Sequence, residues 1–209
     1  MKFFTLGNMS SNCRSVSATA AHLNIDLEVE TLNPMEGQLS SNEFRAINPN
    51  QMAPALEDGG FKLWESRAIA QYLCDQTPGQ TLWPKDAKER ADVGRWMYWN
   101  ACHLGRATGT MAYEKIMKPQ FMKQDPDPSQ IEWAQNQIKK YAPVLNAQLE
   151  STPWVAGQNM TLADFDIGAH LQWADASGVD LKSYTHIQKW QENLNATDAW
   201  KKTAPQMSM

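Results

Sequence analysis

The 209-residue sequence lacks long apolar runs. No stretch approaches the roughly 18 to 20 apolar residues that a membrane span needs. The opening segment, Met1 to Leu6, turns polar before the core of a signal peptide can form. We therefore expect a cytoplasmic protein that has no membrane partner.

Cysteine is also scarce, and basic residues nowhere cluster. Cys13, Cys74 and Cys102 are widely spaced and include no Cys-x-x-Cys pair, which argues against a disulfide framework and against a zinc site. None of the four histidines lies at metal-ligand spacing from a cysteine or carboxylate, so we expect no metal. Lys and Arg form no basic stripe of the kind that binds nucleic acid. Because residues 1–80 contain five Lys or Arg and nine Asp or Glu, local groups have to hold any anionic ligand there.

What the sequence does contain, over residues 1–78, is a pattern typical of a small α/β domain. Alternation and helical spacing predict a βαβ unit with parallel strands, a short helix, an antiparallel hairpin across Asp58-Gly59-Gly60 and a last helix. The expected elements are strands at 2–6, 27–32, 53–56 and 61–63, and helices at 14–23, 43–47 and around 68–73.

The rest of the chain is helical in period. Residues 79–85 form a turn-rich linker, and residues 86–209 predict an all-helical second domain. Apolar residues from Val93 to Leu104 mark one face of a long first helix. Thr161 to Asp164 is typical of a capping box that opens a helix running to about Ala176, which makes Asp164 a structural residue.

Three segments of the first domain carry polar groups where the chain turns. Residues 10–14, Ser-Ser-Asn-Cys-Arg, open a helix, so their hydroxyls and N–H groups lie in the positive field of its N-terminus, where anions are favoured. Pro54 begins a strand, where a cis X-Pro bond can turn a backbone edge toward a ligand. Residues 65–67, Glu-Ser-Arg, open another helix directly after a strand.

In these segments the sequence resembles the cytosolic glutathione transferases, specifically serine-type, bacterial-like members. The resemblance rests on the Pro-Ala-Leu strand and acidic-Gly turn at 54–59, on residues 64–73 (Trp-Glu-Ser-Arg-Ala-Ile-Ala-Gln-Tyr-Leu) and on Thr-Leu-Ala-Asp at 161–164, so it spans essentially the whole chain. It implies a thioredoxin-like N-terminal domain, an all-α C-terminal domain, a homodimer, and glutathione as co-substrate facing a hydrophobic pocket. The implied activity is conjugation of the glutathione thiolate to a hydrophobic electrophile, which is a detoxification reaction.

The resemblance also implies roles for individual residues. Glu65 and Ser66 bind the γ-glutamyl amine and carboxylate of glutathione, and the backbone of Ala53, ahead of a cis proline at Pro54, pairs with the cysteinyl part. The catalytic hydroxyl, four residues before an arginine, falls on Ser10. A hydrogen bond from this serine and the helix N-terminus together suffice for the roughly 2.7 kcal/mol that lowers a thiol pKa by about two units.

Alternatives to this assignment stay open. Ser11 is a second candidate for the catalytic hydroxyl. Cys13 either packs beneath the first helix or forms a mixed disulfide with glutathione, which would make the protein a thiol-disulfide oxidoreductase. A non-catalytic binding or regulatory protein of the same fold is the third reading.

The sequence departs from the family where the glycine carboxylate of glutathione is bound. The positions that often carry a basic or polar residue fall near Leu39 and Met52, and neither side chain neutralises a carboxylate. Gln38 or Gln51 is left to donate a hydrogen bond instead. We therefore expect weak glutathione binding.

The acceptor pocket is expected along the first helix of the second domain. Its candidate lining residues lie off the core-facing stripe of that helix or just beyond it. They are Trp99, His103, Arg106 and Tyr113.

Overall fold

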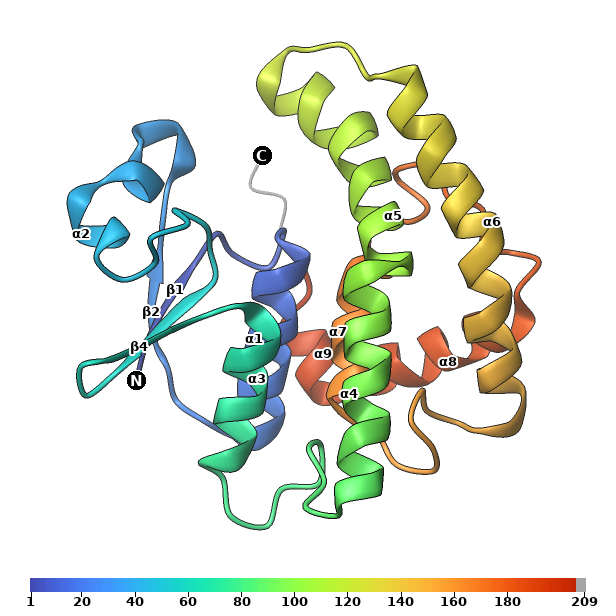
Figure 1. The fold of residues 1–209 in the computed structure, drawn as a ribbon, viewed down its shortest axis with the longest axis horizontal. Helices are drawn as coiled ribbons and strands as arrows, with labels where there is room; N and C mark the ends of the chain where they lie inside the picture. Colours follow the sequence, from blue (N-terminus) through green and yellow to red (C-terminus); the bar gives the residue numbers. More distant parts are fainter. Residues whose placement is uncertain (206–209) are drawn as a thin grey trace. The chain divides into compact units, whose positions relative to one another are not determined.

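The computed structural model describes residues 1–205 and contains two compact units (Figure 1). The first unit combines Met1–Trp83 with the chain from Ala196 onward, and the second is Pro84–Asn195. The chain thus returns to its first unit after the helices of the second. Residues 206–209, which the expected second domain includes, lie outside the described residues.

A four-stranded mixed sheet forms the centre of the first unit. Its strands are β1 (Lys2–Thr5), β2 (Glu28–Thr31), β3 (Ala55–Asp58) and β4 (Phe61–Trp64), in the order β2-β1-β3-β4. β1 is parallel to β2, as the crossover predicts, and β3 is antiparallel to both β1 and β4. In register, Phe4 pairs with Ala55 and Ala55 with Trp64, so the end of β1, the start of β3 and the end of β4 share one edge of the sheet.

Helices cover both faces of this sheet, because alternate strand residues point to opposite sides. Phe3 and Leu56 pack with α1 (Ser11–Leu23) and α3 (Ser66–Asp75) on one face. Phe4 and Ala55 pack on the other face with Phe44 of α2 (Asn42–Arg45). Two short 3₁₀ turns, η1 (Pro34–Glu36) and η2 (Gln38–Ser40), lead into α2. The expected α/β fold of this unit is confirmed.

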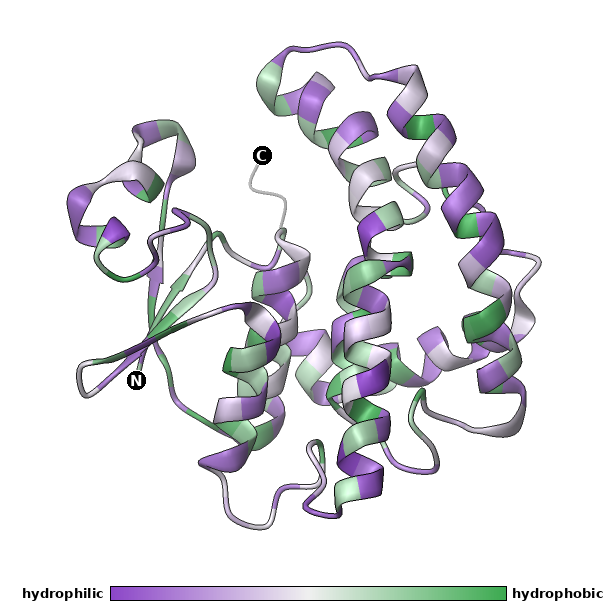
Figure 2. Ribbon diagram, in the orientation of Figure 1, coloured by the Kyte–Doolittle hydropathy of each residue, from purple (hydrophilic) through white to green (hydrophobic). Residues whose placement is uncertain are grey.

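The second unit is helical, as expected. Its elements are α4 (Ala87–Cys102), α5 (Leu104–Ala112), the π-helical η3 (Tyr113–Met122), α6 (Pro128–Ser151), α7 (Leu162–Leu171) and α8 (Thr185–Ala196), and a last helix, α9 (Asp198–Lys202), lies in the first unit. Polar and apolar residues alternate around α4 and α6, which is typical of amphipathic helices (Figure 2). The expected long first helix is wrong in one respect, because it breaks at His103, whose φ of −127° and ψ of −92° are not helical.

Helix α7 begins at the predicted capping box. Thr161 is the N-cap and Asp164 the N3 residue, and nine of the ten residues of α7 are buried. The helix ends at Leu171 instead of near Ala176, and the chain continues in turns. The prediction of its start was therefore correct, and that of its end was five residues too long.

The Asp164 carboxylate is a completely buried junction of the second unit. Its Oδ1 accepts hydrogen bonds from the Val155 N–H at 2.9 Å and from the Trp190 indole at 2.8 Å, and its Oδ2 accepts from the Thr161 N–H at 2.8 Å. Burial raises the pKa of Asp164 to about 6, and the donors offset this rise only in part. The carboxylate therefore joins α7, α8 and the preceding loop at some electrostatic cost.

This raised pKa predicts how stability depends on pH. The folded chain binds the Asp164 proton more tightly than the unfolded chain, so this group adds stability as pH falls through about 6, and the gain is lost again as pH rises. Urea unfolding should show the wild type gaining about 1 kcal/mol over Asp164→Asn between pH 7 and pH 5. The exposed Asp26→Asn is the control. A constant difference, or one of opposite sign, would contradict this account of Asp164.

Candidate active site

The three polar segments singled out in the sequence meet at one edge of the sheet. β1 leads into the turn that opens α1, β3 begins just after Ala53-Pro54, and β4 leads directly into Glu65 and α3. Because the register brings the ends of these strands together, two helix N-termini and a turning backbone edge lie side by side. This arrangement favours a ligand that has both an anionic group and a peptide backbone.

Ser10 is the N-cap of α1 and is half-buried. Its Oγ accepts a hydrogen bond from the Cys13 N–H at 3.4 Å, and its carbonyl accepts from the Arg14 N–H at 2.8 Å. Because Oγ accepts this bond, the hydroxyl can still donate its own proton to another group. Ser11 is the first helical residue, one position beyond the cap.

A side-chain hydrogen bond joins the two helix N-termini. The Ser66 hydroxyl donates to Oδ1 of Asn12 at 3.2 Å, and Ser66 is buried. Asn12 had no assigned role in the sequence analysis, because only the fold brings residues 54 positions apart together. The bond fixes the start of α3 relative to the start of α1.

Glu65 has an unusual backbone conformation. It is the exposed N-cap residue of α3, and its φ of 74° and ψ of 113° lie in a region that non-glycine residues seldom adopt. Such strain clusters at ligand-binding sites, where the surrounding structure holds it. The Glu65 side chain makes no capping hydrogen bond to the first turn of α3.

The backbone before β3 turns through a cis peptide bond. Ala53-Pro54 is cis, as the sequence suggested, and Pro54 is buried while Ala53 is half-buried. The loop ahead of it is held by Asn48, a buried residue that the sequence analysis missed. The Asn48 amide nitrogen donates to the carbonyl of Met52, and its Oδ1 accepts from the Asn50 N–H at 3.0 Å.

The two glutamines near this loop differ in whether their side chains already make hydrogen bonds. Gln38 Oε1 accepts from the Asn33 N–H at 2.6 Å, and its amide nitrogen lies 3.5 Å from a carboxylate oxygen of Glu36. Gln51 has a φ of 57° and is half-buried, and its side chain makes no hydrogen bond to residues 1–205. Met52 is 64% exposed. The side-chain amide of Gln51 is therefore the more available hydrogen-bond donor of the two.

Cys13 lies in the core of the first unit. Its side chain is 0% exposed, packs with Phe3 and Val16, and its sulfur lies 3.5 Å from the N–H of Leu6. The oxidoreductase alternative needs an exposed, reactive thiol. The geometry of Cys13 provides none.

Three of the four candidate acceptor residues pack against α6 within the second unit. His103 stacks on Tyr141 with ring centroids 4.6 Å apart, and Trp99 meets the same ring edge-on at 6.0 Å. The Arg106 guanidinium lies 5.1 Å from the ring centroid of Trp133. Trp99 and His103 therefore share a partner on α6, whereas Arg106 contacts a different residue of the same helix.

The fourth candidate, Tyr113, lies apart from the other three. It begins η3 and is 42% exposed, as is Met117, and Phe121 is 51% exposed. The spacing of four residues puts these side chains along one side of the segment, and π-helical turns are frequent at functional sites. Met117 and Phe121 had no assigned role, because their polar neighbours hide the apolar stripe in the sequence.

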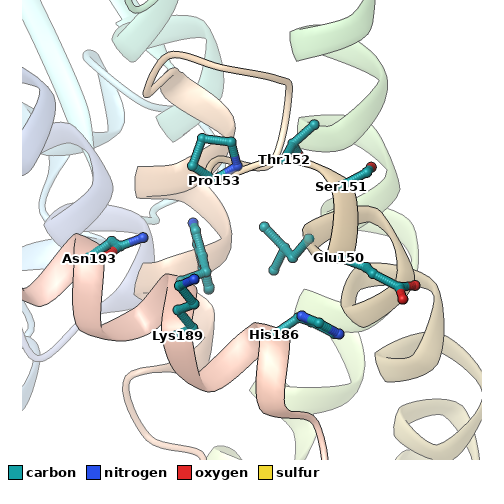
Figure 3. A pocket seen from close by; sticks show the side chains of 9 residues that line it. Glu150, Ser151, Thr152, Pro153, His186, Lys189 and Asn193 are labelled. Carbon is teal, nitrogen blue, oxygen red and sulfur yellow. The ribbon is translucent and has the colours of Figure 1, made fainter.

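A separate polar pocket of about 340 Å³ lies between the end of α6 and α8 (Figure 3). Glu150, His186 and Lys189 are among the residues that line it, and Trp190 is another. None of the residues proposed from the sequence lines it. Within residues 1–205 no helix has the length and apolarity to span a bilayer, and no three His, Cys, Asp or Glu residues gather as a metal site.

A thioredoxin-like sheet with a cis proline between two helix N-termini, followed by a helical unit, defines the glutathione transferase class of fold. Models of the glutathione S-transferase N-terminal and C-terminal domains match residues 1–75 and 110–198. This chain belongs to the glutathione S-transferase family.

Solved structures show the same likeness over nearly the whole chain. A Bombyx mori glutathione transferase is 31% identical, with a TM-score of 0.83, over 97% of this chain and 89% of that one. A delta-class enzyme of Nilaparvata lugens is 30% identical, with a TM-score of 0.84, over 97% and 92%. Glutathione transferase F7 of Populus trichocarpa is 25% identical, with a TM-score of 0.87, over 97% and 96%.

The Ser66–Asn12 hydrogen bond can be tested by a double-mutant cycle. Because the bond is neutral and partly buried, Asn12→Ala and Ser66→Ala should show a coupling energy of about 1 kcal/mol in the free energy of unfolding. Ser17→Ala, farther along α1, should be additive with Asn12→Ala. If the changes in unfolding free energy for Asn12→Ala and Ser66→Ala were also additive, a direct hydrogen bond between the two side chains would be contradicted.

Burial also predicts the order in which the thiols react. Cys102 is exposed, whereas Cys13 and Cys74 are buried, so an aromatic disulfide reagent should modify one thiol of the native protein quickly. Local opening that costs about 3 kcal/mol slows the others about a hundredfold. Cys102→Ser should remove the fast phase. A fast phase that persists there but disappears in Cys13→Ala would revive the oxidoreductase reading.

Proposed function

We propose that this chain is an enzyme that conjugates the thiolate of glutathione to a hydrophobic electrophile, with Ser10 stabilising the thiolate. The observation that supports this best is the position of the Ser10 hydroxyl. It caps α1 at the sheet edge that also carries the cis Pro54 and the start of α3. Such an edge suits a tripeptide with a reactive sulfur near its middle.

The proposed chemistry needs a thiolate and one hydrogen-bond donor. The thiol proton leaves to water, the sulfur attacks an electrophilic carbon, a C–S bond forms, and a leaving group such as halide departs with its electron pair. Because Ser10 Oγ already accepts from the Cys13 N–H, its own proton is available to the sulfur. A charge-assisted hydrogen bond contributes about 1.5–3 kcal/mol and the helix N-terminus about 0.3–1 kcal/mol.

Glutathione would bind along the same edge. Its γ-glutamyl carboxylate would lie at the N-terminus of α3 with Ser66, and its amine at the exposed carboxylate of Glu65. The cysteinyl backbone would pair with Ala53. Gln51 is the better donor for the glycine carboxylate, since Gln38 is committed to its own loop. Because a neutral amide and no cation would bind the glycine carboxylate, the affinity for glutathione should be weak.

The acceptor would bind on the second unit. The exposed apolar side chains of Tyr113, Met117 and Phe121 support η3 as part of its surface. Trp99, His103 and Arg106 remain proposed pocket residues. Their packing against α6 favours a supporting position at the edge of the pocket, with the ring of His103 stacked on that of Tyr141.

A homodimer in the cytoplasm is part of the proposal. Three exposed apolar side chains of the first unit, Met52, Phe61 and Trp64, support an interface with a second copy. The three cysteines form no disulfide in the described residues, which fits a reducing compartment.

The decisive experiment is a pH titration of the bound glutathione thiol by its ultraviolet thiolate absorbance. In the wild type the thiol pKa should lie below the free value of about 8.5. Ser10→Ala should return it toward that value and lower kcat/KM with an aryl halide about ten- to a hundredfold, because the thiolate loses a charge-assisted bond. Ser17→Ala is the control for loss of a hydroxyl on α1.

Each other outcome points to a different assignment. Loss of the depressed pKa in Ser11→Ala but not in Ser10→Ala would move the catalytic hydroxyl to Ser11. Reduction of a glutathione mixed disulfide that disappears in Cys13→Ala would indicate an oxidoreductase. Glutathione binding without any depressed titration would indicate a binding protein of this fold.

A further inference from the structure

The last helix of the chain packs against the first. α9 contacts α1 and lies in the first unit, although more than a hundred residues of the second unit separate the two helices. Trp200 of α9 and Arg14 of α1 meet there, and both are 5% exposed. The carbon of the Arg14 guanidinium lies 3.5 Å from the Trp200 ring centroid, and its Nη2 donates to the Trp200 carbonyl at 3.2 Å.

Arg14 is also the residue that closes the first turn of α1 on Ser10. Its backbone N–H donates to the Ser10 carbonyl at 2.8 Å, which makes this the first hydrogen bond of the helix. The preceding residue, Cys13, gives its N–H to Ser10 Oγ and buries its own side chain in the core. The turn that presents Ser10 is therefore held by Cys13 in the core and by Arg14 against α9.

We propose that Trp200 is a positioning residue for the thiolate site, because its stacking on Arg14 fixes the first turn of α1 and holds a positive charge one turn from Ser10. The inference rests on the proposed function for its catalytic consequence. Trp200 does not touch the reacting atoms.

Both contacts suit a buried cation. The ring face and the carbonyl oxygen of Trp200 each carry negative potential, and a stacked guanidinium gains more from such partners when it is desolvated. Burial lowers the pKa of Arg14 to about 10, which still leaves the group charged at neutral pH. The charge thus adds to the positive field of the helix N-terminus, which favours an anionic sulfur beside Ser10.

The contact between Trp200 and Arg14 also fixes the position of Ser10. A catalytic group works only when neighbouring side chains lock it close to its productive geometry. Ser10 lies at the end of a helix, where the backbone tends to fray. Its carbonyl is held by the hydrogen bond from the Arg14 N–H, so a well-fixed Arg14 also fixes Ser10. The segment from Ala196 onward therefore supplies support that Met1–Trp83 alone lacks.

Two substitutions of Trp200 separate the ring face from apolar bulk. Trp200→Leu keeps an apolar side chain and the backbone carbonyl but removes the π face, whereas Trp200→Phe keeps a π face. In Trp200→Leu the thiol pKa of bound glutathione should rise by about half a pH unit and kcat/KM should fall about threefold. Trp200→Phe should restore most of both. The matched control, Trp190→Phe, loses the indole bond to Asp164 in the second unit and should leave the thiol pKa unchanged.

Hydrogen exchange supplies a readout that does not depend on the reaction. In Trp200→Leu the amides of Cys13 and Arg14 should exchange about threefold or more faster than in the wild type, while amides near the end of α1 keep their rates. A folded Trp200→Leu with unchanged thiol pKa and unchanged exchange would overturn the inference. If the wild type shows no depressed thiol pKa, the proposed function fails, and faster exchange in Trp200→Leu alone would still support the positioning contact.

Discussion

Backbone pairing of Phe4 with Ala55, and of Ala55 with Trp64, determines where the three polar segments of the first unit lie. The residues that follow β1 and β4, and those that precede β3, meet because these three strands pair in this register. A shift of one residue would exchange the faces of β1 and place Phe3 where Phe4 meets Phe44. The two-sided core therefore protects the geometry of the polar edge.

The start of α1 satisfies two opposite demands within four residues. Cys13 packs in the core, whereas the proposed function requires the Ser10 hydroxyl to remain open to a ligand. The first helical turn resolves the conflict, because the N-cap hydroxyl accepts a helix N–H and still has a proton to donate. The Arg14 side chain then packs on Trp200 and so connects this turn to α9. The hydroxyl proposed to stabilise the thiolate thus lies in a turn that is tied to both the core and α9.

Features with a local cause could be predicted from the sequence, and those with a tertiary cause could not. The Asp-Gly-Gly hairpin and the capping box at Thr161 depend on neighbouring residues, so their sequence signals were sufficient, whereas the cis bond before Pro54 was expected from the family resemblance. The break at His103 was not expected, although the chain there leaves room only for glycine at position 105, where a Cβ would lie 2.7 Å from Oδ1 of Asn100. Partners of the site such as Asn12 and Trp200 act across long separations, and α9 is too short to show a packing face.

Buried polar side chains join α7 to α4 and to α8 in the second unit. The Asn100 amide donates to the buried Asp166 carboxylate at 2.8 Å, which ties the end of α4 to α7, and Asp164 joins α7 to α8. Tyr113, Met117 and Phe121 lie beyond this polar network with large exposed fractions. Apolar contacts of this kind discriminate between ligands by only about 1–3 kcal/mol per methylene. A rigidly held Ser10 combined with a loosely selective apolar surface would therefore suit the proposed reaction, in which the nucleophile is constant and the electrophile varies.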